Sequence, residues 1–104
     1  MIKVILTYHE DQVSSIQITG HAQSGPYGQD IVCAGVSVAS IGALNALDVL
    51  CHEDCDLQMQ DNQIDIQVLN YTDNVQNSLD FLRIQLETVR EKYPQSIQIT
   101  RKEV

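Results

Sequence analysis

Apolar and polar residues alternate along five short segments of the chain with the two-residue period of a β-strand. These segments are residues 2–9, 15–19, 57–59, 64–68 and 96–102. Polar residues around Asp11 predict a turn between the first two segments, and Asp61-Asn62 predicts a turn between the third and the fourth. The pattern therefore predicts two hairpins and a last strand, in a sheet with one apolar face and one face exposed to water.

Two longer segments have the pattern of α-helices. Residues 31–51 are apolar on nearly every side, which predicts a helix buried on most sides. This segment approaches the length of a membrane span, but Asn45 and Asp48 interrupt it and acidic residues flank both ends, so a buried helix of a soluble domain is the better interpretation. Thr72 or Asp73 would cap the second helix, and Pro94 would end it. Its apolar residues recur at the spacing of one helix face: Val75, Leu79, Leu82, Leu86, Val89 and Tyr93.

The order of these elements predicts the fold class. A sheet with one apolar face needs a cover, and two helices supply it. We therefore expect an α/β (α+β) two-layer sandwich, with a mainly antiparallel sheet of about five strands covered by two helices in the order ββαββαβ. The chain has 104 residues, which fits one domain spanning 1–104, and no internal repeat or linker divides it.

The charge of the chain excludes several classes of partner. It has 6 Lys and Arg residues against 14 Asp and Glu residues, a net charge of −8. A protein that binds nucleic acid or an anionic membrane through phosphates needs a basic face, so we expect neither partner. An acidic protein is suited instead to a basic partner.

The cysteine content bears on the compartment. Cys33, Cys51 and Cys55 make an odd number, and the N-terminal segment lacks the cleavage site of a signal peptide. Reduced thiols in the cytoplasm are the simpler interpretation.

The junction between the first hairpin and the first helix carries the candidate chemistry. Residues 20–30 combine three glycines and a proline, which predicts an irregular loop. If Asp30 is the N-cap, Cys33 lies in the first helical turn, where backbone dipoles favour a thiolate. His21, at the start of the loop, is a candidate general base that takes the thiol proton and later protonates a leaving amine.

Structural roles for the same residues stay open at this point. A free Cys is often a small buried apolar residue, and the spacing of Cys33 and His21 does not decide between that role and catalysis. Cys51, His52 and Cys55 lie close together, but zinc sites usually need four ligands from two separated pairs, and the chain has no second pair. We therefore predict no metal site and no cofactor.

Two linked motifs around this junction resemble the ribosomal-processing cysteine protease Prp family. The first is GHA at residues 20–22, and the second is QDIVCA at residues 29–34, continued by Val36-Ser37, after a loop that ends in Gly28. The family has a GHA motif, a flexible loop and a G-x-DIVCAAVS motif that opens a helix, so Gly35 departs from its usual Ala. The resemblance implies that His21 and Cys33 are the catalytic dyad.

The resemblance also implies a function and partners. Prp-like proteins are cytosolic, homodimeric cysteine endopeptidases that remove the N-terminal extension of the twenty-seventh large-subunit ribosomal protein. We therefore expect that extension as the substrate, a homodimer, and no direct contact with nucleic acid or membrane. The acidity of this chain is consistent with a substrate carried on a basic protein.

Four further residues of the motifs are expected to bind substrate or to support the site: Gly20, Gly28, Asp30 and Ser37. For Asp30 we favour the N-cap role over that of a third member that orients His21. Two other functions compete with the protease. One is a non-catalytic ribosome-assembly or peptide-binding module; the other is a redox sensor, for which the sequence offers resolving cysteines only far from Cys33.

Overall fold

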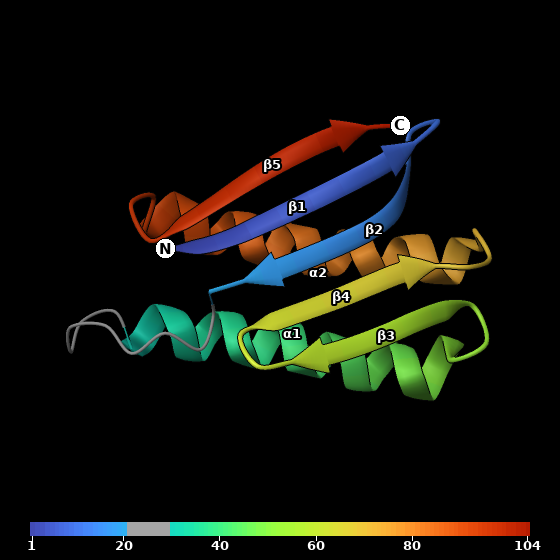
Figure 1. The fold of residues 1–104 in the computed structure, drawn as a ribbon, viewed down its shortest axis with the longest axis horizontal. Coiled ribbons are helices and arrows are strands. Elements are labelled where there is room, and N and C mark those ends of the chain that lie inside the picture. The colour runs from blue at the N-terminus through green and yellow to red at the C-terminus, as the bar shows by residue number, and fades with distance from the viewer. Residues whose placement is uncertain (21–29) are drawn as a thin grey trace.

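The structure, a computed structural model, describes residues 1–20 and 30–104, with Asp30 described by its backbone alone. Its elements are β1 (Ile2–His9), β2 (Gln12–Thr19), α1 (Asp30–Cys51), β3 (Cys55–Gln60), β4 (Gln63–Val68), α2 (Asp73–Lys92) and β5 (Ile97–Glu103). Figure 1 shows the five strands side by side with both helices behind them. The predicted order ββαββαβ is confirmed, and β3 is longer than the predicted segment 57–59 at both ends.

The sheet is mixed, with strand order β3-β4-β2-β1-β5. β1 pairs antiparallel with β2, β2 with β4, and β4 with β3, whereas β5 runs parallel to β1 with Ile97 opposite Ile2. The expectation of a mainly antiparallel sheet is therefore confirmed. Both hairpins close through residues with positive φ, Glu10 and Asp11 in the first and Asn62 in the second, as tight hairpin turns require.

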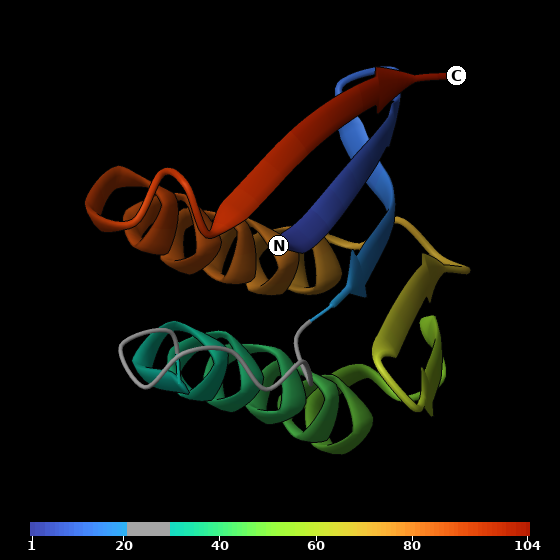
Figure 2. The same ribbon diagram turned by 60° about the vertical axis from the view of Figure 1, so that its left-hand side comes forward.

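Both helices cover one face of this sheet, as the view in Figure 2 makes plain. The strand residues that point toward the helices are buried, among them Val4, Ile16, Ile18, Ile64 and Ile66. Their two-residue alternation is the pattern seen in the sequence, because successive side chains of a strand point to opposite faces. The opposite face carries the polar residues of the strands, together with Ile5 of β1.

The second helix follows the sequence prediction closely. Thr72 is its N-cap, because the N–H of Val75 donates to the Thr72 hydroxyl oxygen at 3.1 Å. Of the two predicted caps, Thr72 and Asp73, the first is therefore the one used. Four residues of the predicted apolar face are buried: Val75, Leu79, Leu82 and Leu86.

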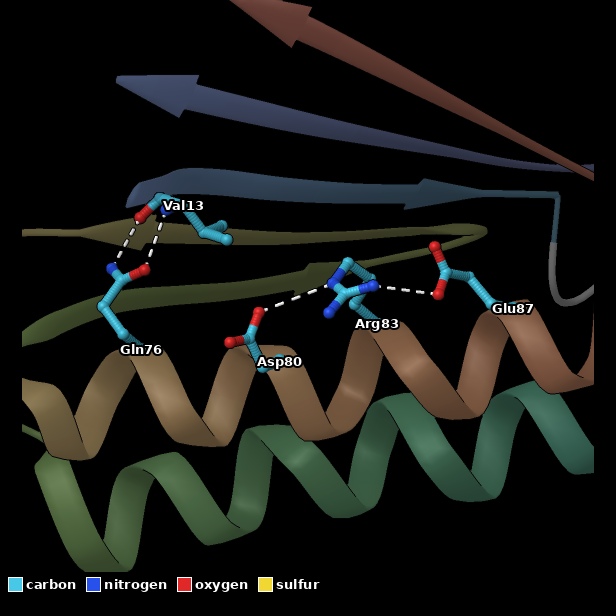
Figure 3. A network of polar contacts seen from close by, with 5 residues as sticks. All are labelled: Val13, Gln76, Asp80, Arg83 and Glu87. Carbon is cyan, nitrogen blue, oxygen red and sulfur yellow. Dashed lines mark hydrogen bonds and ion pairs between the residues drawn. The ribbon is translucent and has the colours of Figure 1, made fainter. Parts of the chain in front are cut away.

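A side-chain amide ties α2 to the start of β2. The Gln76 amide nitrogen donates to the carbonyl of Val13 at 2.9 Å, and the N–H of Val13 donates to the Gln76 oxygen at 2.8 Å (Figure 3). The β1–β2 ladder shifts its register where Tyr8 pairs with Val13. A bulge of this kind takes backbone groups out of the regular ladder, and Gln76 satisfies both groups of Val13.

The first helix departs from the sequence prediction of burial on most sides. Its inner face packs against α2 and β3, but its outer face leaves Val38 75%, Val49 78% and Ile31 66% exposed. By length and composition alone, Ile31–Cys51 would also qualify as a membrane span. The prediction is wrong because one sheet and one neighbouring helix surround α1 on one side only. An apolar surface is therefore left uncovered in the single chain.

Candidate active site

Gly20 fixes the point where the chain leaves β2. Its φ is +82°, a conformation that glycine adopts without the cost that other residues incur. A Cβ placed on Gly20 would lie 2.6 Å from the carbonyl oxygen of Met1, so this position has no room for a side chain. The N–H of Gly20 donates to the carbonyl of Asn62 at 3.1 Å. The residue before His21 is thus held between the N-terminus and the β3–β4 turn, which supports the predicted structural role of Gly20.

Cys33 lies in the first turn of α1. The helix begins at Asp30, so Cys33 is its fourth residue. It is half-buried and packs against the core. The backbone N–H groups of a first helical turn have no partner within the helix, so they are available to bind an anion that forms beside Cys33. A half-buried thiol also remains within reach of an approaching peptide.

Two of the predicted supporting residues lie beside Cys33. Asp30, the predicted N-cap, is the first helical residue of α1, whereas the N-cap of α2, Thr72, directly precedes the first helical residue. Its side chain lies outside the described part of the structure, so its capping role stays a prediction. Ser37 is half-buried one turn beyond Cys33. Its predicted role in the site likewise stays a prediction.

The other two predicted site residues, His21 and Gly28, lie outside the described residues. The contact between His21 and Cys33 therefore stays a prediction.

The remaining cysteines have a different environment. Cys51 and Cys55 are only 4% and 6% exposed, at the end of α1 and the start of β3. Burial, followed by the charges of Cys51 and Asp54, raises the pKa of the Cys55 thiol to about 11. A thiol with so high a pKa is a poor nucleophile at neutral pH, because the thiolate is the reactive form. Within residues 1–20 and 30–104, no group of three or more His, Cys, Asp or Glu side chains is placed to hold a metal ion.

Comparison with known proteins places the chain in a family. The sequence model of the family described as Cysteine protease Prp matches residues 1–98. The chain belongs to this family. The ribosomal processing cysteine protease Prp of Staphylococcus aureus is 33% identical to this Prp-family chain over 106 residues, which cover 98% of this chain and 100% of that protein.

Solved structures of the S. aureus protease resemble this Prp-family chain over its length. The complex with a substrate peptide matches with a TM-score of 0.89 and 32% sequence identity, covering 98% of this chain and 100% of that one. The complex with a covalently linked product peptide matches with a TM-score of 0.87 and 33% identity over the same shares. The resemblance inferred from the two motifs and the predicted fold are thereby confirmed. The chain is a cysteine protease of the Prp family, whose curated members are named for ribosomal processing.

Two contacts that fix the start of the site were missed by sequence reasoning. They are the close approach of the Met1 carbonyl to Gly20 and the hydrogen bond from Gly20 to Asn62. The approach of Met1 depends on the β1–β2 register, in which Lys3 lies opposite Thr19. The hydrogen bond to Asn62 forms only once β2 and β4 lie side by side, with Thr19 opposite Gln63. The sequence pattern predicts a turn at Asp61-Asn62, but it does not indicate that the Asn62 carbonyl accepts a hydrogen bond from Gly20.

Proposed function

We propose that the protein is a cysteine endopeptidase in which Cys33 is the nucleophile and His21 the general base. The observation that carries this proposal is the position of Cys33, half-buried in the first turn of α1, while Cys51 and Cys55 are buried elsewhere. A solved relative that holds a covalently linked product peptide supports a covalent intermediate in this family. A second structure of the same relative, solved with a substrate peptide, supports a peptide substrate.

The reaction proceeds in two steps. His21 takes the thiol proton, and the Cys33 sulfur attacks the carbonyl carbon of the scissile bond while backbone N–H groups of the first helical turn stabilise the oxyanion. The C–N bond breaks, and the protonated His21 gives its proton to the leaving amine. Water then hydrolyses the thioester, which releases the second product and restores the thiol. Asp30, Gly28 and Ser37 support this arrangement by capping the helix, allowing the loop to turn and lining the site.

The substrate is the N-terminal extension of the twenty-seventh large-subunit ribosomal protein. The names of the curated relatives, which include a ribosomal processing protease of S. aureus, support a ribosomal substrate. The net charge of −8 supports attraction of a basic protein and disfavours direct binding of nucleic acid or membrane phosphates. The site of action is the cytoplasm, where reduced thiols persist.

Mass spectrometry of the precursor ribosomal protein tests this proposal. Wild-type protein and Cys51→Ala should both release the extension, because Cys51 is a buried packing residue. Cys33→Ala should leave the precursor intact while its circular dichroism spectrum stays native, and His21→Ala should lose nearly as much activity, since the pair acts as a unit. Cleavage by Cys33→Ala at the wild-type rate would overturn the assignment of the nucleophile.

We also propose that the enzyme is a homodimer. Apolar side chains exposed on the outer side of the helices support this, with Phe81 of α2 68% exposed beside Val38 of α1. Between the helices lies a groove of about 460 Å³, lined by both residues and by small side chains such as Gly42 and Ala46. Exposed apolar surface of this kind marks protein interfaces.

Sedimentation equilibrium tests the dimer. Wild type should have twice the mass of one 11.6 kDa chain, and Phe81→Glu should sediment as a single chain. Thr100→Glu, on the sheet face away from the helices, is the matched control and should remain dimeric. A wild-type protein that sediments as a monomer at micromolar concentration would contradict the proposal.

A further inference from the structure

The two edges of the sheet differ in how they are protected against further strands. An edge strand leaves part of its N–H and C=O groups unpaired, and proteins commonly block such edges with Lys, Pro or other charges. The β5 edge carries Arg101, Lys102 and Glu103. The β3 edge, CDLQMQ, has no Lys, Arg or Pro and only one charged residue, Asp56. β3 is therefore open to pairing with an extended segment.

The charge around β3 is of one sign. Eleven of the 14 acidic residues lie between residues 4 and 82, and none of the 6 Lys and Arg residues does. Around the strand, Asp54 precedes it, Asp56 lies on it, Asp61 follows it, and Asp65 pairs with its Gln58. The ion pairs that Arg83 and Arg101 form are with Asp80, Glu87 and Glu103, not with these acids. A segment bound along β3 would thus enter a field that favours cations.

The β3 edge is joined to the start of the proposed active site. β3 ends at Gln60, and the turn that follows includes Asn62, whose carbonyl accepts the hydrogen bond from Gly20 at 3.1 Å. Gly20 directly precedes His21 in the chain. A substrate that leaves the catalytic residues on this side could therefore continue along β3 as an extended chain.

The side chains of β3 give such a segment two different faces. Cys55 and Leu57 point toward the helices and pack with the core, and Met59, on the same face, is 57% exposed. Asp56, Gln58 and Gln60 alternate with them and point to the open face of the sheet. A matching strand would carry an apolar residue opposite Met59 and cationic residues on the open face.

We propose that the β3 edge is an exosite that binds a cationic, extended segment of the substrate, outside the scissile bond, as a sixth strand. This inference rests on the proposed protease function, because the segment is a part of the cleaved protein. Main-chain hydrogen bonds to β3 supply the pairing, and Asp56 and Asp61 select Lys and Arg. A second copy of the chain is a poorer occupant, because β3 paired with β3 of another molecule would bring two sets of these carboxylates together.

The test measures binding separately from catalysis. The probe is a peptide that spans the scissile bond and carries a tail with four Lys residues, compared with the same peptide whose tail Lys residues are Gln. Binding is measured on Cys33→Ala by fluorescence anisotropy, so that a failure of the proposed catalysis does not hide the result. The charge-reversed variant is Asp56→Lys with Asp61→Lys, both exposed positions. Its matched control is Glu10→Lys, in the β1–β2 turn, with Asp73→Lys, at the start of α2, both also exposed. The β1–β2 turn and the start of α2 lie at the end of the molecule away from the end of β2, which Gly20 follows (Figure 1).

The exosite predicts a local effect. The reversed variant should bind the Lys-tailed peptide about tenfold more weakly at low salt, less so at high salt, and the Gln-tailed peptide unchanged. The control carries the same net charge and should bind both peptides like the parent. With Cys33 restored, KM for the Lys-tailed peptide should rise in the reversed variant while kcat stays the same.

Hydrogen exchange identifies the mode of binding. The Lys-tailed peptide should slow amide exchange in residues 55–60 and leave β5 unchanged, since added strand pairing protects edge amides. Equal weakening by the reversed and control variants, protection on β5, or concentration-dependent protection of β3 without peptide would each overturn the exosite. The last outcome would show that a second copy occupies the edge.

Discussion

The substitution Gly20→Ala should be among the most damaging single-methyl changes in the protein. Gly20 has a φ of +82°, and its added Cβ would lie 2.6 Å from the Met1 carbonyl oxygen and 3.4 Å from the Cα of Ile2. These atoms belong to the main chain, which β1 holds by pairing with β2 and β5. The clash therefore cannot be relieved by rotation of a side chain.

The magnitude follows from two contributions. A non-glycine residue in a left-handed conformation costs about 1–2 kcal/mol. Moving the Met1 carbonyl from 2.6 Å to an acceptable distance above 3.0 Å shifts the chain beside Ile2, whose N–H donates to the Ser96 carbonyl at 3.0 Å. Losing or weakening that hydrogen bond adds about 1 kcal/mol. Gly20→Ala should thus lower the free energy of unfolding by about 2–3 kcal/mol, or roughly 10–20 °C in Tm for a domain of this size.

The matched control is Gly35→Ala, which adds the same methyl group elsewhere. Gly35 lies inside α1, and apart from its two chain neighbours and the backbone of its own helical turns, no described atom lies within 4 Å of a Cβ placed there. Ala in a helix interior is favoured over Gly, so this variant should gain about 0.5–1 kcal/mol. Thermal unfolding followed by circular dichroism measures both variants. Equal midpoints for Gly20→Ala and Gly35→Ala would refute the reasoning, because the difference rests on backbone geometry alone.

Two further outcomes are expected. Gln76→Ala should lower the free energy of unfolding by about 2 kcal/mol, because both backbone groups of Val13 lose their partner. Gln85→Ala, at an exposed position, is the control and should change urea unfolding little. Equal urea midpoints for the two variants would contradict a stabilising role for the Gln76–Val13 hydrogen bonds. Because the pKa of Cys55 is raised from 9.0 to about 11, the folded thiol stays protonated where the unfolded thiol ionises. Below pH 9 the thiol is protonated in both states, so it does not make the free energy of unfolding depend on pH. Between pH 9 and about 11 the free energy of unfolding of wild type should fall relative to that of Cys55→Ala. Urea unfolding of both proteins measures this, and a constant difference across that pH range would contradict the prediction.

Local patterns predicted the elements because each pattern reports one face of one element. The apolar stripe of α2 is buried at Val75, Leu79, Leu82 and Leu86, as its helical spacing indicates. The same reasoning failed for α1, whose sequence is apolar all round. Hydrophobic pattern shows what a residue prefers and not what is available to cover it, so the exposure of Val38 could not be foreseen.

The site was predictable in its chemistry and less so in its geometry. The two sequence motifs point to Cys33 and His21, because these two residues carry the reactive groups. The structure places Cys33 at the start of α1, as expected. The support of Gly20 by Met1 and Asn62 joins residues far apart in the sequence. Such contacts are set by strand order, which short-range alternation does not encode.

The pairing of β5 with β1 has a consequence for the order of folding during synthesis. β1 finds its outer neighbour only when β5 has been made, since Ile2 lies opposite Ile97 and the Val104 N–H donates to the Tyr8 carbonyl. Until β5 emerges from the ribosome, β1 is an unprotected edge strand rich in Ile, Val and Leu. A nascent or truncated chain that stops before Ile97 would therefore be prone to aggregate.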